Sequence, residues 1–172
     1  LNGGADASKF SINSSTGALT FSSAPDYESP TDSNSGNDYV VVVRATDSSS
    51  NTSDQTLTVS VNGINETPSN ISLSSSSFNE NIASSSIVAT LSSSDPDSSD
   101  THTYSLVNGS GDTDNNSFTI DGSSLIIKAS PDYETKSSYS IRLQTTDSSG
   151  EIYAKAFTLS VNGLNESPSN IS

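Results

Sequence analysis

The chain contains no cysteine, methionine or tryptophan, and it has only 6 basic residues against 20 acidic ones. The absence of cysteine excludes a disulfide framework and thiolate metal sites. A small domain without disulfides needs another means of stabilisation, and a bound metal ion is one option. The formal net charge of −14 argues against nucleic acid as a partner, because phosphate binding depends on basic patches.

The sequence also lacks an apolar run of about 18 residues, so it predicts no membrane span in this segment. Hydrophobic residues make up only 30% of the chain, but they cluster in short alternating runs, which a disordered segment would not need. This pattern predicts folded β-domains with modest cores. The chain starts at Leu1 with neither an initiator Met nor a signal peptide, so we expect it to be an internal piece of a longer chain.

An internal repeat organises the sequence. The stretch SVNGINETPSNIS at 60–72 recurs as SVNGLNESPSNIS at 160–172, an offset of 100 residues. The triplet DYE occurs at 26–28 and again at 132–134, and the loop after it is longer in the first copy. Loops that change length while strand patterns persist are typical of tandem globular repeats, here of about one hundred residues.

The second repeat is complete and has the pattern of an all-β domain. Tyr139, Ile141 and Leu143 alternate with polar residues, as expected for one face of a strand. Turn residues separate the apolar runs, and a helical period is almost absent. The predicted strands are 71–74, 87–91, 103–107, 117–120, 125–128, 138–145 and 152–161. This succession favours a seven-stranded Greek-key β-sandwich of Ig-like architecture.

The first repeat contains only the last four of these strands, near 10–12, 18–21, 39–45 and 55–61. Four strands cannot close a two-sheet core, so either the chain was cut from a longer protein or another chain supplies the missing strands. We favour the first alternative. The predicted domains are therefore the C-terminal part of a repeat at 1–66, a complete repeat at 67–166, and the start of another at 167–172.

Pairs of acidic residues recur at the same place in both repeats. If the backbone is extended, Asp26 and Glu28 share one side, as do Asp132 and Glu134, while the tyrosine between them faces the core. Two unit charges about 4 Å apart repel by about 1 kcal/mol in water and about 4 kcal/mol at an effective dielectric near 20. A cation between them would remove this cost. Oxygen ligands on flexible loops favour Ca²⁺ over Zn²⁺ or Cu²⁺, although a solvated acidic surface is the alternative.

Further acids are predicted at both ends of the sandwich. In a Greek-key sandwich the loops after strands two and six lie at one end, which places Asp95, Asp97 and Asp147 together, with Asp100 just beyond Asp97. The other end carries Glu80, Asp132 and Glu134. If repeats stack, the base of one meets the top of the next. We expect the junction in this chain to gather Asp26, Glu28, the linker 62–66, Asp95, Asp97 and Asp147.

Several short motifs resemble those of cadherin repeats. DYE resembles the cadherin DRE motif, whose outer acids bind Ca²⁺, and FNENI at 78–82 resembles the PEN motif. DPD at 95–97 resembles DxD, and the segments that end in Asp47 and Asp147 resemble A-x-D. The linkers NGINETP and NGLNESP resemble the cadherin linker. Over essentially its whole length, the chain is similar to tandem cadherin-like repeats of the kind found in large bacterial surface adhesins.

The resemblance implies a set of Ca²⁺ ligands: Asp26, Glu28, Asn62, Asn65, Asp95, Asp97, Asp147, Glu80, Asp132, Glu134 and, for an upstream junction, Asp47. Gly63 and Gly163 stand where such repeats usually carry a linker Asp, and Asn62, Asn65 and backbone carbonyls would compensate only in part. Fewer anionic ligands imply weaker affinity. We therefore expect about one or two ions per junction rather than the three of animal cadherins.

The sequence predicts calcium-rigidified extender or adhesion repeats of a secreted, extracellular cell-surface protein, whose partners are the neighbouring repeats of the same chain. A carbohydrate-binding or homophilic binding module is the alternative, and Tyr104 and Tyr153 are the aromatic residues to test for sugar binding. Other domains would carry a cell-surface ligand. We expect no enzyme, because the lone His102 has no evident partner acid or nucleophile and should be a half-exposed strand residue.

Overall fold

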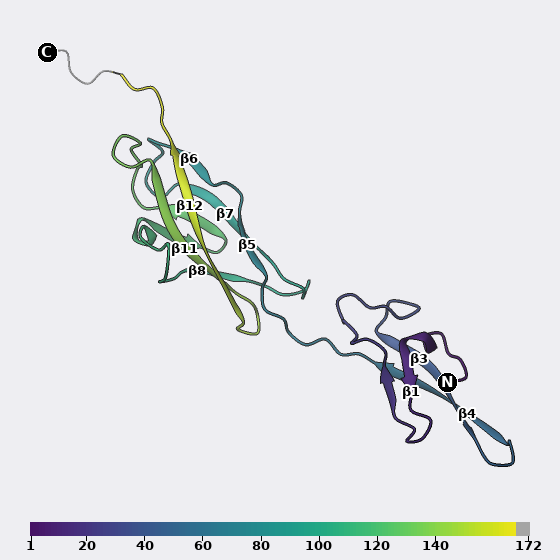
Figure 1. The fold of residues 1–172 in the computed structure, drawn as a ribbon. Helices are drawn as coiled ribbons and strands as arrows, with labels where there is room; N and C mark the ends of the chain where they lie inside the picture. Colours follow the sequence, from purple (N-terminus) through teal and green to yellow (C-terminus); the bar gives the residue numbers. More distant parts are fainter. Residues whose placement is uncertain (168–172) are drawn as a thin grey trace. The chain divides into compact units, whose positions relative to one another are not determined.

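The structure, a computed structural model, describes residues 1–167 (Figure 1). The chain divides into two compact units, one from Leu1 to Ile64 and one that begins at Asn65. The expected start of a further repeat at 167–172 lies outside the described residues, apart from Ser167. No helix in the described part of the chain has the length and apolar character needed to cross a membrane.

The second unit is a sandwich of two four-stranded sheets (Figure 1). One sheet has the order β5-β7-β10-β9 and the other the order β6-β12-β11-β8. Neighbouring strands are antiparallel except for β6, which runs parallel to β12. The strands are β5 (Asn70–Leu73), β6 (Ser77–Asn79), β7 (Ile87–Ser94), β8 (Thr103–Leu106), β9 (Phe118–Asp121), β10 (Ser124–Ile127), β11 (Ser138–Thr146) and β12 (Ile152–Asn162). The predicted all-β sandwich is confirmed.

The first strand of this sandwich continues into the opposite sheet as β6. Ser74 N–H donates to Thr90 O on the β7 side, whereas Ser76 O accepts from Ser160 N–H on the β12 side. Between them, Ser75 Oγ donates to Ser77 O at 2.7 Å. Serine hydroxyls that bond nearby backbone groups compete with ladder pairing, so the serine run at 74–77 lets the chain cross between sheets. The sequence predicted one strand here, and the crossing adds an eighth.

Side chains from the inner faces of both sheets form one core. Ile71 and Leu125 from one sheet and Leu143 from the other are 0% exposed. Burial of each such side chain contributes about 1.5–3 kcal/mol. Phe118 meets the ring of Tyr139 edge to face, with 5.3 Å between centroids, an arrangement that aromatic pairs prefer. The core therefore ties the two sheets together and fixes the loops at either end.

The first unit consists of two hairpins, β1 (Phe10–Ile12) with β2 (Leu19–Phe21) and β3 (Asp38–Thr46) with β4 (Thr52–Ser60). These bounds match the four predicted strands to within about three residues. Its core consists of Phe10, Tyr39 and Val41 with partly buried neighbours. The two units repeat one another in detail, because Asp6 accepts from Val40 N–H at 2.8 Å and Asp114 accepts from Ser140 N–H at 2.7 Å.

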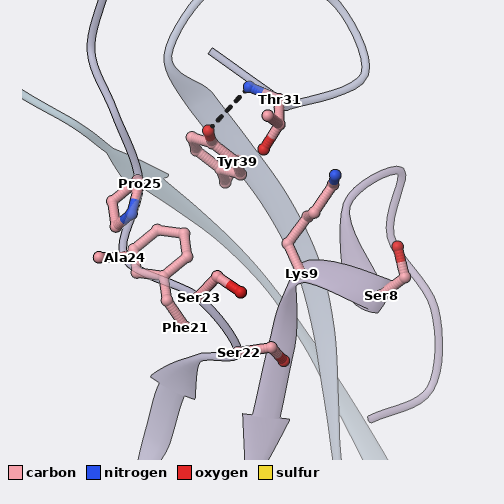
Figure 2. A pocket seen from close by; sticks show the side chains of 9 residues that line it. All are labelled: Ser8, Lys9, Phe21, Ser22, Ser23, Ala24, Pro25, Thr31 and Tyr39. Carbon is pink, nitrogen blue, oxygen red and sulfur yellow. Dashed lines mark hydrogen bonds between the residues drawn. The ribbon is translucent and has the colours of Figure 1, made fainter. Parts of the chain in front are cut away.

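One side of the first core is open. A cavity of about 380 Å³ is bordered by the rings of Phe21 and Tyr39 (Figure 2). The Tyr39 hydroxyl accepts from Thr31 N–H at 3.1 Å, which holds the loop above the ring. In the second unit, the ring of Phe78 from β6 lies 6.0 Å from that of Tyr139.

Candidate metal sites

The two DYE triplets lie in turns rather than in extended backbone, so the prediction for their local structure is wrong. Asp26 Oδ1 accepts from the N–H groups of Glu28 at 3.0 Å and Ser29 at 3.1 Å. Asp132 accepts from both the N–H and the hydroxyl of Thr135, at 3.1 and 2.9 Å. An aspartate side chain that bonds the backbone two or three residues later stabilises a turn, and the extended interpretation overlooked this preference.

The tyrosines of the triplets do not enter the core, contrary to prediction. Tyr27 is 45% exposed and Tyr133 is 43% exposed. A Cβ atom at Gly63 would lie 2.8 Å from Cδ1 of Tyr27, and one at Gly163 would lie 3.0 Å from Cδ1 of Tyr133. Each ring therefore lies against a linker glycine, and a side chain at either glycine would require the ring to shift.

The base of the second unit gathers Glu80, Asp132 and Glu134, as the sequence predicted for these acids. Their carboxylate oxygens lie within 4.8 Å of one another. Glu80, just after β6, is 1% exposed, and its carboxylate accepts from Tyr133 N–H at 2.8 Å and from Leu164 N–H. The turn at 132–135 and the segment after β12 therefore both attach to this one carboxylate.

Backbone donors, rather than basic side chains, stabilise the charge at this end. The N–H groups of Leu164 and Tyr133 lower the pKa of Glu80 in spite of its burial and the nearby charge of Asp132. The hydroxyl and N–H of Thr135 lower the pKa of Asp132. Among residues 1–167, no Lys or Arg forms an ion pair with any of the three acids. Glu80 and Asp132 therefore stay anionic near neutral pH and can accept a cation.

The opposite end of the second unit gathers Asp95, Asp100 and Asp147, whose carboxylate oxygens also lie within 4.8 Å of one another. The side chain of Asp95 is 3% exposed, and His102 Nε2 lies 2.9 Å from its Oδ2. Asp100 Oδ2 is buried, and it has no hydrogen-bond partner among the described residues. Its other oxygen, Oδ1, accepts from Ser148 Oγ at 2.9 Å, so Oδ2 is an exception to the rule that buried polar atoms have a partner.

Asp147 is the most firmly held member of this group. Its Oδ1 accepts from the N–H groups of the turn that follows β11, including Gly150 at 2.6 Å and Glu151 at 2.9 Å. Its Oδ2 accepts from Asn65 Nδ2 at 2.9 Å. The bond from Asn65 and these backbone bonds lower the pKa of Asp147 although burial opposes the shift. Asn65, a predicted ligand in the linker, thus contacts the end of its own unit.

Asp97 does not share the surroundings of Asp95, although the sequence predicted that both would lie together with Asp147. Its N–H donates to Asp95 Oδ1 at 3.1 Å, which bends the DPD segment into a turn. Its own Oδ2 accepts from the backbone N–H of Glu66 at 2.8 Å. Asp100, rather than Asp97, lies beside Asp95 and Asp147. The only indication in the sequence was that Asp100 is a third acidic residue, three positions after Asp97.

The remaining predicted ligands lie in the first unit. Asp47 accepts from the N–H groups of Ser49 and Asn51 and so caps the turn that follows β3. The Asn51 side chain bonds the same carboxylate and is the main cause of the lowered pKa of Asp47. Asn62 is exposed just beyond β4. The gathering of Asp26, Glu28 and Asn62 with ligands from the second unit stays a prediction.

Two aromatic residues and the histidine differ from expectation. Tyr104 and Tyr153 pack against the hydrophobic core, and the Tyr104 hydroxyl lies 3.2 Å from Ser93 Oγ. They therefore do not form the exposed platform that sugar binding would need. The side chain of His102 is 13% exposed rather than half-exposed, because it pairs with Asp95. No pattern in the sequence indicated this pairing, which depends on how the turn at 95–100 folds.

No protein-family model and no curated protein sequence matches this chain. Solved structures do match. PcdhgB3 EC1-4 aligns with a TM-score of 0.68 at 21% identity, over 96% of this chain and 40% of that one. Human protocadherin-24 EC1-2 aligns with a TM-score of 0.68 at 21% identity, over 95% of this chain and 80% of that one. Extracellular cadherin domains 1-4 of protocadherin gamma B7 align with a TM-score of 0.62 at 22% identity, over 93% and 39%.

These similarities show that the chain has the fold of cadherin extracellular domains, as the motifs predicted. At this level of identity the likeness concerns the fold alone. The chain spans about two fifths of the length of the PcdhgB3 structure. Its function therefore has to be argued from its own carboxylate clusters.

Proposed function

We propose that the chain is part of a secreted, extracellular cell-surface protein whose cadherin-like repeats are stiffened by Ca²⁺. In this proposal the ion binds the acids at the end of one sandwich together with the linker and the acids of the next. A row of such repeats forms a rod that holds a distal binding domain away from the cell. A large bacterial surface adhesin, the class that the motifs resemble, is the kind of protein that needs such a rod.

One observation carries the proposal. Asp100 Oδ2 is buried without a partner among residues 1–167, and it belongs to a group with Asp95 and Asp147. Ser148 Oγ donates to Asp100 Oδ1 at 2.9 Å, but a buried carboxylate oxygen without a partner is still costly, and three carboxylates within 4.8 Å also repel one another. A divalent cation bound by hard oxygen ligands removes both costs, and Ca²⁺ accepts irregular sets of carboxylate and carbonyl oxygens. The residues present therefore fit a calcium ion.

The residues of each end have distinct parts in this mechanism. Asp95, Asp100 and Asp147 would hold an ion at the end next to the linker, and Asn65 would position Asp147. Glu80, Asp132 and Glu134 would hold an ion toward the repeat that follows. Without an ion, repulsion between carboxylates loosens each end. A bound ion stabilises the folded unit by about 2.7 kcal/mol when its free concentration is a hundred times its dissociation constant.

The direct test is calorimetric titration of the chelated chain with Ca²⁺, with Asp100→Asn as the variant. We expect this variant to bind fewer ions or to bind them at least tenfold more weakly. Asp121→Asn is the matched control, because it removes the same charge from an exposed position at the end of β9 and should bind as the parent does. No heat of binding in the parent chain, or equal loss in both variants, would contradict the proposal.

A further inference from the structure

We propose that Asn62 and Asn162 are sites of spontaneous deamidation, a modification that would add a carboxylate at the end of β12 and just beyond the end of β4. The chain contains four Asn-Gly pairs, at 2–3, 62–63, 108–109 and 162–163. The structure distinguishes the two linker pairs, 62–63 and 162–163, from the pair at 108–109. This inference goes beyond the proposed function and does not depend on it.

The chemistry needs only the chain and water. The backbone nitrogen of the following residue attacks the side-chain carbonyl carbon of Asn, and a C–N bond closes a succinimide ring while the side-chain nitrogen leaves as ammonia. Water then opens either carbonyl of the ring. One opening gives aspartate, and the other gives isoaspartate, in which the backbone gains one methylene. A following glycine favours the attack because it has no Cβ and adopts the required conformations readily.

The glycine N–H must be free to react, and this condition separates the linker pairs from the pair at 108–109. Gly63 and Gly163 lie beyond the ends of β4 and β12, and neither N–H donates a hydrogen bond within the described residues. In contrast, Gly109 N–H donates to Asp112 Oδ2 at 2.9 Å. Asn62 and Asn162 are also exposed, so water can reach the succinimide.

The two linker pairs differ in how firmly the asparagine is held. Asn162 Nδ2 donates to Asn79 Oδ1 at 3.1 Å, and the Asn162 carbonyl accepts from Glu80 N–H at 3.1 Å. The side chain of Asn62 makes no hydrogen bond to another residue in the range 1–167. We therefore expect Asn62 to react fastest, Asn162 more slowly, and Asn108 slowest.

Modification at Asn162 would disturb the neighbouring carboxylate cluster. Glu80 bonds the chain on both sides of the Asn162–Gly163 peptide, because its N–H donates to Asn162 O and its carboxylate accepts from Leu164 N–H. In isoaspartate the backbone runs through the former side chain of residue 162, so the carbonyl that accepts from Glu80 N–H becomes part of a free carboxylate and the path from Cα to Gly163 gains a methylene. Both bonds cannot then keep their present geometry. We infer that slow conversion at Asn162 loosens Glu80 and destabilises this end of the second unit.

The test is to age the full chain in mildly alkaline, calcium-free buffer and to follow each Asn-Gly pair by peptide mapping. Deamidation raises the peptide mass by about 1 Da, and isoaspartyl methyltransferase labels the isoaspartate. In the folded chain we expect Asn62 and then Asn162 to convert several times faster than Asn108. In strong denaturant all the pairs should react at similar rates, because they share the local sequence Asn-Gly.

Two variants test the assignment of the site and the effect of the methylene separately. Asn162→Gln should abolish the signal at 162 and leave that at 62 unchanged. Asn162→Asp adds the negative charge but not the extra methylene. Its melting temperature should therefore be closer to that of the parent chain than the melting temperature of the isoaspartyl fraction is. Conversion of Asn108 in the folded chain as fast as Asn62 would overturn the assignment of sites. An isoaspartyl-162 fraction that melts as the unmodified chain does would overturn the inference about Glu80.

Discussion

At the scale of single residues, the two ends of the second unit hold their buried carboxylates by different means. Glu80 is 1% exposed, and two backbone N–H groups satisfy its charge. Asp100 has a buried oxygen with no partner among residues 1–167. Hydrogen bonds within the protein therefore satisfy the carboxylate of Glu80, whereas the proposed function assigns the second oxygen of Asp100 to a cation. The first residue should matter for folding and the second for calcium binding.

We expect Glu80→Gln to lower the melting temperature of the second unit on the order of 5 °C, even without calcium. Glutamine keeps one acceptor oxygen but turns an amide group toward the second N–H donor, which loses its bond. Differential scanning calorimetry in chelator measures the change. Glu134→Gln is the matched control, because it removes an exposed carboxylate of the same cluster and should alter the melting temperature far less. If the Glu80→Gln variant and the parent had the same melting temperature, Glu80 would have no structural role.

The lowered pKa values predict how the calcium-free chain responds to acid. Glu80, Asp132 and Asp147 all have pKa values below the ordinary 4.5 for Glu and 3.8 for Asp. The unfolded chain therefore binds protons more readily than the folded one, and the stability from these groups is fully present above pH 4.5. It is lost as the pH falls through the lower, folded-state pKa values.

The melting temperature of the calcium-free chain should be constant above pH 4.5 and should decrease as the pH is lowered further. The Glu80→Gln variant should show a shallower fall, because one of the coupled groups is gone. A melting temperature that rises on acidification would mean that carboxylate repulsion outweighs these hydrogen bonds.

The sequence predicted which acidic residues lie at the two ends of the second unit, but it did not predict which of them lie next to one another. Glu80, Asp132 and Glu134 lie together as predicted. The prediction that Asp95 and Asp97 lie together was wrong, because Asp95 accepts from the Asp97 N–H and bends the chain. Aspartate side chains near turns bond nearby backbone N–H groups, and the sequence alone does not show which N–H each one bonds.

At the scale of elements, β6 completes the second core. This strand of three residues pairs in parallel with the end of β12, and its Phe78 contacts both Phe118 and Tyr139. The sequence predicted the longer strands from alternation but missed β6, which is too short to show a period. Its position depends on pairing with β12, far away in the sequence, so local patterns could not identify it.

Phe78→Ala should destabilise the second unit by about 3–5 kcal/mol, because the side chain is 8% exposed and its loss opens the centre of the core. Denaturation followed by far-UV circular dichroism measures the change. Ile87→Ala is the control, since Ile87 is 60% exposed and should cost less than about 0.5 kcal/mol. Similar costs for the two variants would show that β6 does not close the core.

At the scale of the whole molecule, the charge of −14 makes the calcium-free chain sensitive to ionic strength. Monovalent salt shortens the screening length from about 10 Å at 0.1 M to about 3 Å at 1 M. We therefore expect added sodium chloride to raise the melting temperature in chelator, by reducing repulsion between the clustered acids. In saturating calcium the same addition should have little effect. Equal salt responses with and without calcium would indicate that the clusters do not control stability.

The central claim is that calcium fixes one repeat relative to the next. The absence of cysteine allows a clean test, because spin labels can be attached at Ser14→Cys and Thr119→Cys, two exposed positions in different units. Pulsed electron spin resonance then gives the distribution of distances between the labels. The account predicts a broad distribution in chelator and a narrow one in calcium, with Asp100→Asn staying broader than the parent. A distribution of the same width with and without bound calcium would contradict it.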